Sequence, residues 1–73
     1  MNPVNFEDMN CIFKAEGCGD LPALKIDKHI ISCWEMTEKE KKEFMKTGKI
    51  YLSVMGNIQP PVSLYVDRPY IRQ

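Results

Sequence analysis

Apolar and polar residues alternate most regularly in the last third of the chain, in the segment 49–68. Two runs within it follow the period of two that is typical of a β-strand. The aliphatic positions are Ile50, Leu52 and Val54 in the first run and Val62, Leu64 and Val66 in the second. A proline-bearing loop joins the two runs. The pattern therefore predicts a β-hairpin that turns its aliphatic face toward the core.

The first half of the chain contains shorter apolar runs. Residues 1–10 are polar and aperiodic, so we expect an extended or frayed, peripheral lead-in. Residues 10–14 predict a short strand, and the glycines of 17–20 predict a turn after it. Alternation through residues 21–34 then predicts a second hairpin that reverses at Asp27-Lys28. This turn lacks the glycine that tight hairpin turns favour.

A helix is predicted between these two hairpins. Thr37 and Glu40 have the spacing of a capping box, in which each side chain bonds the backbone N–H of the other residue. Good helix formers follow, and Gly48 stands where a left-handed residue ends a helix. Because the helix has few apolar residues, we expect Phe44 and Met45 to dock it as a lid on a sheet.

The predicted element order is β-β-β-α-β-β. Strands grouped around one short helix indicate an α+β fold with a small antiparallel sheet of about four to five strands. The chain contains no repeat, low-complexity tract or linker, so we expect residues 1–73 to form a single domain. A chain of this length buries only about 60% of its unfolded surface, which predicts a marginal core and favours self-association.

Composition narrows the functional classes. Ten basic and ten acidic residues give a net charge of zero, and the lysines of the helix region are interleaved with glutamates, which disfavours nucleic-acid binding. The odd number of cysteines, three, and the absence of a signal peptide favour a reducing cytoplasm. No apolar run approaches the roughly 20 residues of a membrane span, so we expect no membrane partner.

Four residues are candidate sites of chemistry. Cys11, Cys18, His29 and Cys33 are ligand types that zinc prefers, but their spacing lacks the close pairs of structural zinc sites. Cys18, between two glycines, is a candidate nucleophile without an obvious base. We therefore expect neither an enzyme nor a cofactor, and we assign no metal ligand.

A binding surface is the stronger candidate. Tyr51 and Tyr65 share the face of the predicted hairpin opposite the aliphatic one, where they form a platform for a flat ligand or another subunit. The alternative is that the helix, the other hairpin or a symmetry mate covers this face. The residues assigned to the surface are Tyr51, Ser53, Met55, Gln59, Pro60, Tyr65 and Arg68.

Three short motifs carry a resemblance to known proteins. They are Ser32-Cys33-Trp34, then Thr47-Gly48-Lys49-Ile50, and then Gln59-Pro60-Pro61-Val62. In this order the chain resembles a group of short proteins encoded by tailed phages and prophages, over residues 32–66. The resemblance implies a phage gene product that acts in a bacterial cytoplasm, and it transfers no catalytic or binding residue.

The leading hypothesis is a small, non-enzymatic accessory protein of phage type that self-associates. It would bind a host factor or sequester a small ligand, for example in counter-defence. Two alternatives remain open, namely a structural virion or assembly component and a small zinc-binding domain.

Overall fold

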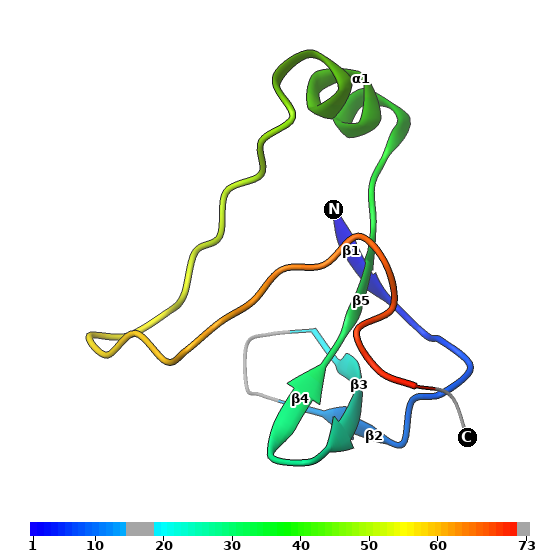
Figure 1. Cartoon of the computed structure of the whole chain (residues 1–73), viewed down its shortest axis with the longest axis vertical. Coiled ribbons are helices and arrows are strands. Elements are labelled where there is room, and N and C mark those ends of the chain that lie inside the picture. The colour runs from blue at the N-terminus through cyan, green and yellow to red at the C-terminus, as the bar shows by residue number, and fades with distance from the viewer. Residues whose placement is uncertain (15–18, 72–73) are drawn as a thin grey trace.

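The computed structural model describes residues 1–14 and 19–71, which contain five short strands followed by one helix (Figure 1). The predicted α+β class, with small antiparallel sheets of five strands in total and one helix, is confirmed. The strands are β1 (Asn2–Val4), β2 (Cys11–Phe13), β3 (Leu21–Ile26), β4 (His29–Ile31) and β5 (Cys33–Glu35), and the helix is α1 (Glu38–Thr47).

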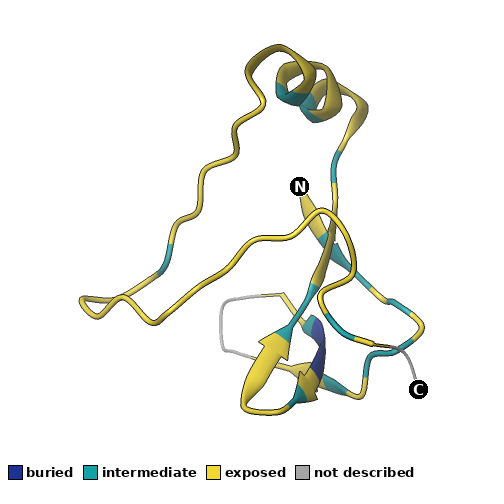
Figure 2. Cartoon of the chain, in the orientation of Figure 1, coloured by how far each residue is buried: buried dark blue, intermediate teal, exposed yellow. Residues whose placement is uncertain are grey.

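Strand β3 is the centre of the fold. It pairs with β2 on one side and β4 on the other, whereas β1 and β5 form a separate two-stranded sheet. Among the described strands, β3 alone has a hydrogen-bonded neighbour on both sides. Its residues Pro22, Ala23 and Leu24 are the buried ones (Figure 2). The core therefore lies on one strand and is very small.

The side chain of Asn10 extends the pairing between β2 and β3. Its Oδ1 accepts from the Lys25 N–H at 2.8 Å, and its Nδ2 donates to the Lys25 carbonyl at 3.1 Å. The Asn10 N–H also donates to the Ala23 carbonyl at 2.9 Å. The amide thus occupies the place of one more strand residue, which shows that the main-chain groups of Lys25 face β2.

The predicted hairpin over residues 21–34 is confirmed for β3 and β4. Ile26 pairs with His29 across a two-residue turn in which Asp27 and Lys28 have φ angles of 46° and 65°. Positive φ at both positions is the signature of the hairpin turn whose twist matches that of the strands. The turn therefore forms without glycine, although side chains at these angles are strained.

Of the two expectations for residues 1–10, the extended one holds for Asn2–Val4 and the frayed, peripheral one is wrong. Strand β1 pairs antiparallel with β5, so that Asn2 lies opposite Glu35 and Val4 opposite Cys33. Pro3 lies opposite Trp34 and has no N–H to donate. This pairing joins positions about thirty residues apart, and no local pattern in the sequence predicts such a contact.

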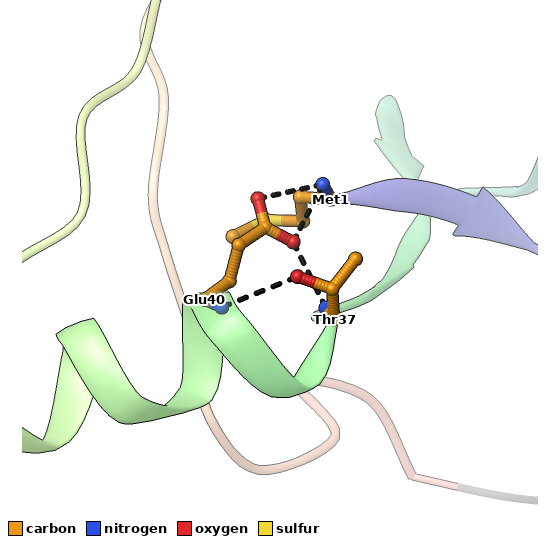
Figure 3. A network of polar contacts seen from close by, with 3 residues as sticks. All are labelled: Met1, Thr37 and Glu40. Atoms are coloured by element: carbon orange, nitrogen blue, oxygen red, sulfur yellow. Dashed lines mark hydrogen bonds and ion pairs between the residues drawn. The ribbon is translucent and has the colours of Figure 1, made fainter.

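The predicted helix and its caps are confirmed. The Glu40 N–H donates to the Thr37 hydroxyl at 3.2 Å, and the Thr37 N–H donates to the Glu40 carboxylate at 2.9 Å (Figure 3). The Met1 ammonium also donates to this carboxylate at 2.7 Å, which ties the start of the helix to β1. At the other end, Gly48 adopts a φ of 64° and its N–H donates to the Phe44 carbonyl.

The helix is not a lid on a sheet as predicted. It lies beyond the end of β5, apart from both sheets, and none of its residues is buried (Figure 1). Phe44 is half-buried, but Met45 is 84% exposed and does not dock the helix. The helix is held mainly through its capped first turn, because its sequence offers little apolar surface.

The hairpin predicted over residues 49–68 does not form. From Lys49 to Ile71 the described chain contains no strand, and residues 49–69, which we call the arm, run out in two diverging limbs with a bend at Gly56-Asn57 (Figure 1). Pro60 and Pro61 cannot donate backbone hydrogen bonds, and an isolated two-stranded hairpin is marginal in water. The alternation is therefore present, but the limbs do not pair with each other.

The strained turn predicts a stabilising substitution. Lys28→Gly should raise the free energy of unfolding by about 1 kcal/mol, because glycine adopts positive φ without a steric penalty. Urea unfolding at one fixed protein concentration measures the change. Lys28→Ala is the control, since it removes the same side chain but keeps the strain; equal stability of the two variants would contradict the assignment.

The capping network predicts a pH dependence. The Met1 ammonium, followed by the Thr37 N–H, lowers the pKa of Glu40 below its ordinary value of 4.5. A carboxylate with a lowered pKa contributes stability above its unfolded pKa and loses that contribution as the pH falls through the folded pKa. The wild-type helix should therefore be more stable at pH 7 than at pH 3.

Circular dichroism at both pH values checks this dependence. Glu40→Gln should reduce the difference between pH 7 and pH 3, because the amide does not titrate. Glu43→Gln, on the same helix but outside the capping network, is the matched control. If both variants kept the wild-type pH dependence, Glu40 would not be its source.

Candidate functional site

The residues assigned to a binding surface all lie exposed on the arm. They are Tyr51, Ser53, Met55, Gln59, Pro60, Tyr65 and Arg68. Tyr51 is 96% exposed and Met55 is 93% exposed, which is unusual for large apolar side chains. The arm thus presents these residues to solvent without the support of a sheet.

The structure does not gather these residues into one platform. Tyr51 and Tyr65 lie on different limbs, and no pleated face joins them because the hairpin is absent (Figure 1). Gln59 contacts only its own loop, where its Nε2 donates to the Pro60 carbonyl at 3.1 Å. The flat platform predicted from the alternation is therefore not preformed.

Tyr51 lies where the arm leaves the helix. It lines an open hollow of about 370 Å³ together with Glu43, Thr47 and Lys49. The hollow combines an aromatic ring with one acidic, one basic and one hydroxyl side chain. This mixture of groups suits a polar or amphipathic segment of another chain better than an apolar ligand.

The opposite side of the predicted hairpin is exposed as well. The expectation that its aliphatic residues form the core is wrong, because only Val54 is half-buried (Figure 2). The exposed aliphatic residues of the arm are Ile50, Leu52, Ile58, Val62, Leu64 and Val66. The arm therefore exposes aliphatic side chains on both limbs, and the rest of the described chain covers them only in part.

Both ends of the arm are fixed to the rest of the molecule. At its start, the left-handed Gly48 ends the helix that Met1 ties to β1. At its end, the Tyr70 hydroxyl donates to the Asp8 carboxylate at 2.8 Å, and the Arg68 guanidinium lies 5.6 Å from the centre of the Tyr70 ring. The arm is a loop with two attachments and not a free tail.

Asp8 and Tyr70 were not singled out in the sequence. They are 62 positions apart and neither belongs to a periodic run, so no sequence signal connects them. Arg68 was assigned to the surface, and its contact with Tyr70 places it at the base of the arm. The residues that position the arm are thus partly different from those that the alternation pointed to.

The cysteines and the histidine form no metal site in the part of the chain that the structure describes. No group of three or more His, Cys, Asp or Glu side chains gathers there in a geometry that could hold a metal ion. Cys11 is half-buried, with its Sγ 3.5 Å from the Ala23 carbonyl, whereas Cys33 and His29 are exposed. Cys18, the candidate nucleophile, lies outside the described residues.

Comparisons with known proteins were made at three levels. No protein family, no curated protein and no solved structure matched the chain. Within residues 1–14 and 19–71, no helix has both the length and the apolar character needed to cross a membrane. The arm and the unpaired strand edges are therefore the features on which a functional proposal depends.

The contact between Tyr70 and Asp8 predicts how the arm is held. Tyr70→Phe removes the hydroxyl donor and should weaken this attachment by about 1 kcal/mol, while the ring near Arg68 remains. Backbone NMR order parameters of residues 62–68 should fall, and those of β3 should stay unchanged. Tyr51→Phe is the control because its side chain is almost fully exposed. Equal order parameters in the two variants would contradict a role for this hydroxyl.

Proposed function

We propose that this chain is a non-enzymatic, self-associating binding protein of phage type that uses the arm as its working surface. Its partner would be a host factor, or it would sequester a small ligand, in the cytoplasm of a bacterial host. The observation that carries the proposal is the large apolar surface that the chain leaves uncovered. The resemblance of its short motifs to phage and prophage proteins supports the biological context.

The area of the exposed surface supports association. The chain exposes 6946 Å², whereas a compact monomer of 8.5 kDa exposes about 4,650 Å². The excess is roughly 2,300 Å², and the radius of gyration of 13.6 Å is likewise larger than the approximately 11 Å expected for this length. An excess of this size is comparable to what one subunit buries in a stable homodimer.

The composition of this surface also supports binding. Large exposed apolar patches on a small protein mark interaction sites more often than solvated surface. On the arm such side chains follow one another over some twenty residues, while the buried apolar residues of the described chain are confined to β3. An arm of this composition gains free energy by docking, because water is removed from its side chains.

The residue-level test combines two substitutions with a mass measurement. Tyr51→Ala with Tyr65→Ala should remove two large aromatic contacts, and each such hot spot typically contributes 2 kcal/mol or more, so we expect association or ligand retention to weaken at least about tenfold. Native mass spectrometry reports the number of subunits, and any retained ligand, in the same experiment. Met45→Ala is the matched control, because Met45 is also exposed but lies on the helix.

Two outcomes would contradict the proposal. In the first, the wild type is a well-folded monomer at micromolar concentration that retains no ligand and captures no host protein from infected cells. In the second, the double variant remains folded and keeps every subunit contact and partner of the wild type. Recovery of the protein in purified phage particles would instead favour a structural role in the virion.

A further inference from the structure

Strands β4 and β5 follow each other directly and share one open edge. Lys25 turns its main-chain groups toward β2, where Asn10 bonds both of them. Ile30 lies opposite Lys25 in the pairing of β3 with β4. In an antiparallel pair, the main-chain groups of two opposed residues either point toward each other or both point away from each other. Because those of Lys25 point toward β2, the N–H and C=O groups of Ile30 point away from β3.

The same reasoning applies to β5. Pro3 has no N–H, so its pairing with Trp34 is one of the non-hydrogen-bonded pairs of the ladder. The main-chain groups of Trp34 therefore point away from β1. The main-chain groups of successive strand residues point to opposite sides, so residues separated by an even number of positions point to the same side. Ile30 and Trp34 are four positions apart, and their main-chain groups therefore point to the same side. The two strands, interrupted only at Ser32, thus present one edge over residues 29–35, which we call the open edge.

The open edge lacks two of the features that protect sheet edges from other strands. Natural edges carry lysine, proline, a bulge or a covering loop. Residues 29–34 contain neither lysine nor proline. The side chains of Ile30 and Trp34 are 57% and 49% exposed, and among the described strands none pairs with this edge. An incoming apolar strand would find both free backbone groups and apolar side chains here.

The first limb of the arm has the properties of such a strand. Residues 50–55 alternate with a strand period, contain no proline and, within the described chain, are part of no sheet. Their length is close to that of the open edge. The limb has no strand partner and the open edge has none either, and Figure 1 shows the limb running from the helix to the tip of the arm apart from both sheets.

A second copy of the chain is the occupant that satisfies both requirements at once. Two copies related by a twofold axis each offer a limb and an open edge, so every exchanged strand is matched by another. The net charge of zero means that the copies do not repel each other. The exposed excess of roughly 2,300 Å² per chain gives a combined area within the range of obligate homodimers.

The geometry points to a reciprocal exchange in which residues 50–55 of each copy pair as a strand with the open edge, residues 29–35, of the other copy. This inference rests on the proposed self-association and specifies its surface. In each copy the incoming limb adds a single strand, which extends the sheets of both β4 and β5 by main-chain hydrogen bonds. The aliphatic positions of the limb are then covered by residues of the partner copy.

One variant tests the edge. Ile30→Glu places a carboxylate on the open edge, while Lys25, directly opposite, provides a cross-strand ion pair that supports the hairpin. Met45→Glu is the matched control, since it introduces the same charge at an exposed helix position away from the edge and the arm. Sedimentation equilibrium should show a dimer that is at least about tenfold weaker for Ile30→Glu than for Met45→Glu. Circular dichroism checks that both variants remain folded.

A second pair of variants tests the limb. Leu52→Pro and Ser53→Pro each delete one N–H, and consecutive N–H groups on a strand point to opposite sides. One of the two should therefore weaken the dimer more than the other. Leu52→Ala and Ser53→Ala are the matched controls for the lost side chains. A difference between the two proline variants that exceeds the difference between the two alanine variants separates strand pairing from unspecific apolar contact.

Mixing the variants gives the decisive measurement. An Ile30→Glu copy has an intact limb, and the weaker proline variant has an intact edge, so the mixture should form a heterodimer with one exchanged strand. We expect the mixture to associate more tightly than either variant alone. Two results would show that the exchange is wrong while self-association stands. In the first, the wild type dimerises but the edge and limb variants dimerise as tightly as Met45→Glu. In the second, the mixture associates no more tightly than the separate variants. If the wild type is a monomer throughout, self-association itself is wrong.

Discussion

The pairing of β3 with a strand on each side is the constraint on which the rest of the molecule depends. Apolar burial in the described chain is restricted to this strand, and backbone hydrogen bonds from β2, β4 and Asn10 fix it in place. The strained turn at Asp27-Lys28 sets the register of β4, and β4 leads directly into β5. The position of β5 in turn fixes both β1 and the first residue of the helix.

The parts of the fold that the sequence could predict depend on neighbouring residues. Each of these parts is determined by residues that lie within a few positions of one another. They are the capping box of Thr37 and Glu40, the end of the helix at Gly48 and the strand over Cys11–Phe13. The pairing of β1 with β5 and the contact of Tyr70 with Asp8 join distant positions, and loop closure of this kind leaves no periodic signal. Sequence reasoning therefore found the elements but not the contacts between them.

The arm shows a different limit of sequence reasoning. Its residues alternate with the period of a strand and lie exposed on the outside of the molecule, but a strand also needs a partner with free backbone groups. The sequence alone does not show whether that partner is the second limb, another part of the chain or another molecule. The interpretation of Ile50, Leu52 and Val54 as core residues failed because it assumed an intramolecular partner.

The two attachments of the arm set its reach. A loop held near Gly48 and Tyr70 has about eleven residues on each side of its midpoint, so its tip extends at most about 36 Å at 3.3 Å per residue. The longest dimension of the molecule is 34 Å. The arm is therefore long enough to cross one neighbour of the same size but too short to reach past it. Its length therefore suits contact with one adjacent molecule and not a tether between distant ones.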